Sequence, residues 1–151
     1  MKKYEFTSET RKIDNVLLHR IRRLSDGVIG GWIESEDNLS QEGKCFVHNN
    51  ACVFGNARVF GNAHIFCDAW IHDSARIFGN VDVSDNAYVC GDACVCGDVL
   101  VNGNACVFGN ACVSGNAWVG ENAEVHGNVR IGGNSRVFGN SNIDGDEEIK
   151  S

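Results

Sequence analysis

The sequence predicts an all-β fold in which short strands stack in parallel as successive coils of one chain. The first observation is a six-residue repeat that runs 17 times from position 47 to position 148 without an insertion or a deletion. The second is that Val or Ile begins all 17 hexads, and the third is that Asn or Asp stands fourth in 16 of them. With 151 residues, of which 43% are hydrophobic, the chain is long enough for one domain and too apolar to be disordered.

A period of six residues fits neither the face of a helix nor a long alternating strand, but it fits a short strand, a tight turn and a short strand again. The β-branched residue at position one packs inward. Gly stands at position three in 12 hexads, and with the Asn or Asp of position four it suits a turn, where we expect position four to adopt the left-handed backbone region. Ala at position five of 11 hexads fits a crowded interior corner, and positions six and two point outward.

This repeat strongly resembles that of the hexapeptide-repeat superfamily of left-handed parallel β-helices, and the resemblance covers about two thirds of the chain. It implies a single-stranded helix in which three hexads close one triangular coil, so that 17 hexads make nearly six coils. Residues 30–45 (GGWIESEDNLSQEGKC) are similar to the lead-in of the YdcK-type proteins, which are labelled acyltransferases. That label follows the fold and carries no evidence of chemistry.

We divide the chain into a β-rich N-terminal cap at residues 1–46, the β-helix at residues 47–148 and a short tail at residues 149–151. A β-helix leaves unpaired backbone at each end, so the first coil needs a cap. Residues 16–24 (VLLHRIRRL) fit a helix or a strand by their spacing, and the similarity to YdcK-type proteins favours a strand.

The cap also contains turn signals and apolar residues that suit the end of the first coil. Residues 26–27 (Asp-Gly) and 30–31 (Gly-Gly) are expected to form turns. Trp32, Ile33 and Leu39 are expected to plug the open end of the first coil, because exposed backbone there must be covered.

Charge is distributed unevenly along the chain. Residues 1–25 carry seven Lys or Arg against three Asp or Glu, and the remaining residues carry six against 17. The basic run Arg20, Arg22 and Arg23 would suit nucleic acid, but the array behind it is acidic and contains no recognition helix. We therefore expect a solvated face or a contact to the acidic array, and no nucleic-acid partner.

No apolar run approaches the roughly 20 residues of a membrane-spanning helix, so we expect no membrane partner. Two lysines near the start are followed by no apolar stretch, so we expect no secretory signal and a cytoplasmic location. The eight Cys residues are then reduced thiols, and stacked pairs such as Cys94 and Cys112 serve as small apolar side chains.

Residues 18 apart stack on one side of three-hexad coils, so the outward positions define three faces. Face one carries positions 52 and 54 and their equivalents every 18 residues, face two starts from positions 58 and 60, and face three starts from positions 46 and 48. These positions are strongly apolar, as is typical of a protein interface. We predict a homotrimer whose interface uses seven residues of face one: Phe54, Trp70, His72, Tyr88, Cys90, Cys106 and Phe108.

Two arginines lie one coil apart on face two, and each is followed two residues later by Phe. Arg58 and Arg76 repel each other when unpaired, so we expect a negative group nearby. The arginine stems can simply cover the phenylalanines, or an acid from another subunit can pair with them. The sharper prediction is a site in which both guanidinium groups hold a phosphorylated or nucleotide-like anion over Phe60 and Phe78.

The histidines give weaker signals for catalysis and for metal. An acyltransferase needs a His general base and a cleft for acetyl-CoA or another acyl-CoA. His72 and His126 lie on face one, with Glu124 placed to orient His126, but no loop interrupts the hexads, so we assign no catalytic residue and no cofactor. His48 and His64 lie on adjacent coils at opposite ends of the strand. The four do not reproduce the three-histidine zinc spacing of the carbonic-anhydrase-like members, so we expect no metal site.

The sequence therefore predicts a non-catalytic homotrimeric β-helix that serves binding or assembly, with a small anionic ligand at the clefts between subunits. One alternative is an acyl-CoA-dependent acyltransferase of the hexapeptide-repeat superfamily. Another is a purely structural rod in a larger assembly.

Overall fold

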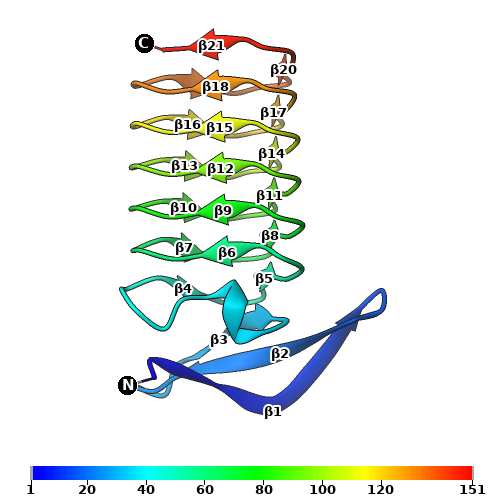
Figure 1. The fold of residues 1–151 in the computed structure, drawn as a ribbon, viewed down its shortest axis with the longest axis vertical. Coiled ribbons are helices and arrows are strands. Elements are labelled where there is room, and N and C mark those ends of the chain that lie inside the picture. The colour runs from blue at the N-terminus through cyan, green and yellow to red at the C-terminus, as the bar shows by residue number, and fades with distance from the viewer. Residues whose placement is uncertain (1, 151) are drawn as a thin grey trace.

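The computed structural model, which describes residues 2–150, is a parallel β-solenoid of about seven turns with almost no helix (Figure 1). The strands stack along the long axis, from an N-terminal hairpin at one end to β21 (Glu148–Ile149) at the other. Among the described residues the helical content is η1 (Glu36–Asn38), a single 3-10 turn capped by Ser35. The prediction of an all-β fold of stacked parallel coils is confirmed.

Each two-residue strand lies at a junction, where position six of one hexad meets position one of the next, and strands 18 residues apart pair in parallel, as Tyr88 pairs with Cys106. The predicted columns of outward residues are therefore confirmed as three sheets. Face one is formed by β5 (Cys52–Val53), β8 (Trp70–Ile71), β11 (Tyr88–Val89), β14 (Cys106–Val107), β17 (Glu124–Val125) and β20 (Asn142–Ile143). Face two is formed by β6 (Arg58–Val59), β9 (Arg76–Ile77), β12 (Cys94–Val95), β15 (Cys112–Val113), β18 (Arg130–Ile131) and β21. Face three is formed by β4 (Phe46–Val47), β7 (His64–Ile65), β10 (Asp82–Val83), β13 (Leu100–Val101), β16 (Trp118–Val119) and β19 (Arg136–Val137).

Positions one and five of the hexads form the core. Val107 and Ala111 are completely buried, and the same positions are buried in nearly every coil. Burying one Val or Ile side chain contributes about 1.5–3 kcal/mol, so this stack of side chains is the main source of stability. The inward direction of positions one and five is as predicted.

The turns differ from the prediction, because position three and not position four adopts the left-handed backbone region. The φ angle is 65° at Gly109 and 58° at Asp73, and φ is positive at position three of every hexad. A Cβ atom placed on Gly109 would lie 2.9 Å from the amide nitrogen of Gly127, one coil along. Glycine is favoured at position three both by its φ angle and by the close approach of the next coil.

Asn and Asp at position four have a different role, which is to form ladders of side-chain hydrogen bonds between coils. The Asn110 amide donates to Oδ1 of Asn128 at 3.1 Å, and the Asn128 amide donates to Asp146 at 3.0 Å. A second ladder joins Asn86, Asn104, Asn122 and Asn140. Each such bond connects one coil to the next and helps to keep the coils in register.

The N-terminal segment forms a hairpin that is continuous with the sheet of face one. β1 (Tyr4–Ile13) and β2 (Val16–Arg23) are antiparallel, and the hairpin extends past the side of the solenoid in Figure 1. β2 is also antiparallel to β3 (Ile29–Ile33), which then pairs in parallel with β5. The strand predicted at residues 16–24 is confirmed.

Two details of this segment differ from the prediction. A turn at residues 24–26 leads into Gly27 at φ 75°, as expected, but the Gly30-Gly31 pair lies inside β3. A Cβ atom on Gly31 would lie 2.4 Å from the carbonyl oxygen of Ala51, so these glycines allow close backbone approach rather than a turn. Ile33 and Leu39 are buried in the solenoid interior as predicted, whereas Trp32 packs outside it in a separate cluster with Leu18 and Cys52.

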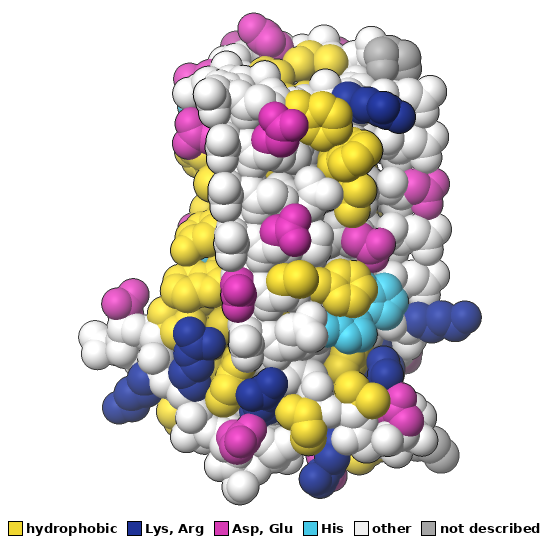
Figure 2. Space-filling view, turned by 180° about the vertical axis from the view of Figure 1, so that it is seen from behind, with side chains coloured by type: hydrophobic (Ala, Val, Ile, Leu, Met, Phe, Trp, Pro, Cys, Tyr) yellow, Lys and Arg dark blue, Asp and Glu magenta, His cyan; other side chains and the backbone are white. Residues whose placement is uncertain are grey.

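Lys and Arg side chains gather towards the N-terminal end of the molecule (Figure 2), but the arginines of β2 do not pair with the acidic array. Arg22 pairs with Glu5, and Arg23 forms an ion pair with Asp26 at 2.8 Å. Arg20 donates to the carbonyl oxygen of Gly30 at 2.9 Å. The ion pairs of these arginines are therefore with acids inside residues 5–26, whereas the contact to the array is a hydrogen bond from Arg20 to the carbonyl oxygen of Asn49 at 3.2 Å.

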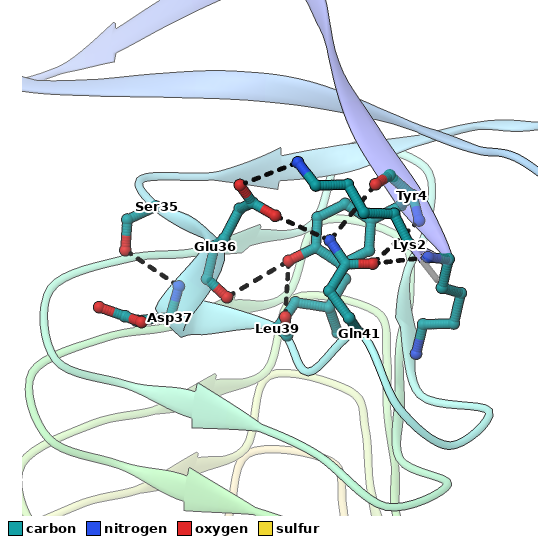
Figure 3. Close-up of polar contacts among 8 residues, drawn as sticks. Lys2, Tyr4, Ser35, Glu36, Asp37, Leu39 and Gln41 are labelled. Carbon is teal, nitrogen blue, oxygen red and sulfur yellow. Dashed lines mark hydrogen bonds and ion pairs between the residues drawn. The ribbon is translucent and has the colours of Figure 1, made fainter.

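A buried tyrosine fixes the start of the chain to the first coil (Figure 3). The Tyr4 hydroxyl donates to the carbonyl oxygen of Leu39 at 2.6 Å, and burial raises the pKa of this hydroxyl. The Gln41 side chain accepts from the amides of Lys3 and Tyr4 and donates to Glu36 at 2.9 Å. These bonds satisfy polar groups at the N-terminal end of the solenoid, where a cap is required.

Candidate functional site

Face one carries a column of aromatic side chains at its outward positions. The rings of Phe54 and His72 are stacked with centroids 5.1 Å apart, and those of Trp70 and Tyr88 are stacked at 5.5 Å. Tyr88 remains 38% exposed, more than any other large hydrophobic residue of the coils. From residue 52 to residue 108 the outward positions of this face carry no Lys, Arg, Asp or Glu. The seven predicted interface residues therefore share one uncharged surface.

The two histidines of face one each lie beside a carboxylate. Nδ1 of His72 is 3.3 Å from Oδ1 of Asp73, and Nδ1 of His126 is 3.1 Å from Oδ1 of Asp144. The predicted role of Glu124 is wrong, because its carboxylate accepts from Asn142 and the acid beside His126 is Asp144. His72 and His126 are 54 positions apart in sequence, which is three coils, so they belong to separate sites.

Face two brings the predicted anion-binding residues together in part. Arg58 and Arg76 are direct partners on neighbouring strands, and both are exposed. The rings of Phe60 and Phe78 are stacked with centroids 4.8 Å apart. A groove of about 370 Å³ is lined by seven residues: Glu36, Asp37, Ser40, Arg58, Val59, Phe60 and Arg76. Phe78 is not among them, and the two acids in the lining oppose the binding of an anion.

Face three contains a histidine pair that the sequence reasoning separated. Nε2 of His48 lies 2.9 Å from Nδ1 of His64, so the two rings share a hydrogen bond although they start from opposite ends of their strands. His48 is also stacked on Phe66, with ring centroids 4.5 Å apart. Burial, and then the neighbouring His64, lower the pKa of His48 to about 4. Both rings are therefore neutral near pH 7, which suits a packed polar contact.

Comparison with known proteins supports the repeat assignment. No family model matches the chain. A curated relative, the "Uncharacterized acetyltransferase YdcK" of Escherichia coli (strain K12), is 38% identical over an alignment of 69 residues, which covers 36% of this chain and 21% of the relative. This match, the unbroken hexads and the stacked parallel coils agree with one another. The chain is a parallel β-solenoid built on a six-residue repeat, which is consistent with the hexapeptide-repeat superfamily.

The chain spans about a fifth of the length of the curated relative it matches. The predicted similarity to YdcK-type proteins is confirmed. Across residues 2–150, no helix has the length and apolar character needed to cross a membrane.

The thiols of face two pack as the sequence predicts. Cys94 and Cys112 are direct partners on neighbouring strands of the β-solenoid. Burial, together with the neighbouring thiols, raises the pKa of Cys94 to about 11, so this thiol is protonated near pH 7. A protonated, half-buried thiol behaves as a small apolar side chain.

Sequence reasoning missed Asp73 because it treated a carboxylate in a turn as a turn former, and it placed Asp144 on face one without pairing it with His126. It placed Cys90 directly above His72 in the column of face one, but it considered no metal site there. The separation of 18 residues between His72 and Cys90 was a signal for this contact, since it equals the distance between stacked positions. His72, Asp73 and Cys90 together place three potential metal ligands within 4.8 Å of one another.

Proposed function

We propose that the protein is a non-catalytic binding and assembly module, in which a left-handed β-helix with triangular coils forms a homotrimer through face one. The observation that carries this proposal is the uncharged aromatic column of Phe54, Trp70 and Tyr88. Aromatic side chains dominate the energetics of protein interfaces, and burying each contributes about 1.5–3 kcal/mol. In a single copy this column stays in contact with water. We place the protein in the cytoplasm, where its thiols stay reduced.

The second part of the proposal is an anionic ligand on face two, of a phosphorylated or nucleotide-like class. Arg58 and Arg76 present two guanidinium groups from directly paired positions. Guanidinium groups bind phosphate through paired hydrogen bonds, and a stacked Phe60–Phe78 pair offers a flat apolar surface for a base. Glu36 and Asp37 also line the groove and oppose any anion, so binding depends on paired hydrogen bonds from both guanidinium groups.

The anion site predicts that the Arg58→Ala, Arg76→Ala double variant loses binding of AMP by about tenfold or more while keeping the oligomeric state of the wild type. The reason is that both charged donors are removed from a surface position that contributes nothing to the core. Isothermal titration calorimetry with AMP and with inorganic phosphate measures the loss. Arg130→Ala is the matched control, since Arg130 lies on the same face three coils along from Arg76. Equal binding by the double variant and the wild type would remove face two from the proposal.

A second candidate function is acyl transfer from acetyl-CoA or another acyl-CoA. The name of the Escherichia coli relative favours it, and so do the His72–Asp73 and His126–Asp144 pairs, because a carboxylate can orient a His general base. In that case His72 or His126 would take the proton from the acceptor hydroxyl or amine.

We expect the wild type to show no turnover of acetyl-CoA with common amine and hydroxyl acceptors, and His72→Ala and His126→Ala to behave like it. A thiol-release assay for free coenzyme A measures this. Transfer by the wild type that disappears in either variant would replace the binding module by the enzyme. A trimer that binds no anion and transfers no acyl group would favour the structural rod.

A further inference from the structure

Three side chains from two neighbouring coils of face one meet at the ends of β8 and β11. His72 follows β8, Asp73 occupies the turn after it, and Cys90 follows β11 directly above His72. Their donor atoms all lie within 4.8 Å of one another. The interface prediction uses His72 and Cys90 as packing residues, but it gives no role to the carboxylate of Asp73 beside them.

The distances suit a small cation held by all three groups. Nδ1 of His72 and Oδ1 of Asp73 are 3.3 Å apart. Metal–nitrogen and metal–oxygen bonds of about 2.0–2.2 Å in a tetrahedral site place two such ligand atoms about 3.3–3.5 Å apart. Cys90 is half-buried on the next coil, and its sulfur lies within 4.8 Å of the other two donor atoms.

The surrounding groups hold two of the ligands in place. The amide of Gly91 donates to Oδ2 of Asp73 at 3.0 Å, which leaves Oδ1 free towards His72 and lowers the pKa of the Asp73 carboxyl. The ring of Phe54 lies parallel to that of His72, with an interplanar angle of 9°. Hydrogen bonds and packing that orient the ligands are a regular feature of metal sites in proteins.

We propose that His72, Asp73 and Cys90 bind a Zn²⁺ ion. Imidazole, thiolate and carboxylate together match the preference of zinc, whereas Mg²⁺ and Ca²⁺ require oxygen ligands. Three protein ligands leave a fourth tetrahedral position for water. All three ligands come from one chain, although His72 and Cys90 also belong to the proposed interface, and the site differs from the shared three-histidine sites that the sequence analysis excluded.

Zinc binding releases one proton from the thiol. The metal is bound by the thiolate, so the proton passes to the buffer and the affinity falls as the pH is lowered.

The same face supplies a matched control. His126 also stacks on a phenylalanine, Phe108, at 4.6 Å, and it also lies beside a carboxylate, Asp144. The position 18 residues after His126 is Asp144 itself, whereas the position 18 residues after His72 is Cys90. The His126 pair therefore lacks the thiol and has only two of the three ligand types.

The test is titration of the full-length protein, freed of any metal-binding tag, with Co²⁺ and then with Zn²⁺. We expect one Co²⁺ per chain with a sulfur-to-metal charge-transfer band, and displacement of that band by Zn²⁺. His72→Ala and Cys90→Ser should each weaken binding by about tenfold or more, and Cys90→Ser should also abolish the band. His126→Ala should match the wild type. Asp73→Asn, which tolerates the left-handed backbone, should weaken binding with the band retained.

Three results would overturn the proposal. They are the absence of a sulfur band in the wild type, a band that survives Cys90→Ser, or equal binding by His72→Ala and the wild type. Circular dichroism of each variant shows whether it is folded. The absorption spectrum tests metal binding, and the molecular mass in solution tests the trimer. A failure of the zinc proposal can therefore be distinguished from a failure of the trimer proposal.

Discussion

Replacing Gly109 by Val lowers the free energy of unfolding by about 3 kcal/mol, and replacing its neighbour Asn110 by Val lowers it by about 1 kcal/mol. Gly109 has φ 65°, a region that a β-branched residue rarely adopts and that costs about 1–2 kcal/mol. The new Cβ would also lie 2.9 Å from the backbone of the next coil, and relieving such overpacking adds about 1–3 kcal/mol.

The Asn110→Val substitution lowers the free energy of unfolding less than Gly109→Val does. Its side chain is exposed, and it loses one hydrogen bond, to Asn128, with a typical net contribution of about 1 kcal/mol. Asn110→Gly should therefore cost about as much as Asn110→Val. Urea denaturation followed by circular dichroism measures all three variants. Equal losses for Gly109→Val and Asn110→Val would show that position three is not the strained position of the turn.

The largest change in assembly is expected from Trp70→Asp and Tyr88→Asp, each of which should convert the trimer into single chains. Both side chains lie in the middle of the uncharged column of face one, and their rings are stacked on each other at 5.5 Å. A carboxylate there would have to be buried without a partner, which costs several kcal/mol at an interface. Light scattering coupled to gel filtration measures the mass of each variant.

The matched control is Trp118→Asp on face three. Trp118 is half-buried, and its indole N–H donates to Asn102 at 3.1 Å. Its hydrogen bond is therefore satisfied within its own chain. We expect this variant to keep the mass of the wild type. Loss of the trimer in Trp118→Asp but not in Tyr88→Asp would move the interface to face three.

The repeat made the coils predictable, because one period determines which positions are buried and which residues stack. Val107 and Ala111 are buried and Tyr88 pairs with Cys106, as the spacing of 18 residues requires. The turn was assigned to the wrong position because both Gly and Asn tolerate positive φ, and composition cannot distinguish them. The close approach between Gly109 and Gly127 makes that distinction, and it is visible only once the coils are stacked.

Side-chain partners of the site were harder to predict for a geometric reason. Stacking relates positions 18 apart, but a side chain at position two also reaches position six of the next coil, 16 residues along. His48 with His64, Asn102 with Trp118 and His126 with Asn142 all follow this rule. The rule also explains why His48 and His64 meet although their strand positions differ.

The N-terminal segment lacks the repeat, so its structure could be predicted only from local residue types. The Gly30-Gly31 pair has the composition of a turn, yet the approach of Val47 and Ala51 explains both glycines inside a strand. Trp32 has the size of a core plug, yet β2 covers it from outside through Leu18. Both errors arise because tertiary contacts decide between conformations that the local sequence allows.

The mass of the wild-type protein in solution tests the central claim most directly. Sedimentation equilibrium at several micromolar concentrations should give three times the chain mass of 16.4 kDa, with no dependence on AMP or on metal. A mass of one chain throughout that range would mean that the aromatic column of face one stays exposed to water. That result would contradict the proposal that the protein is an assembly module.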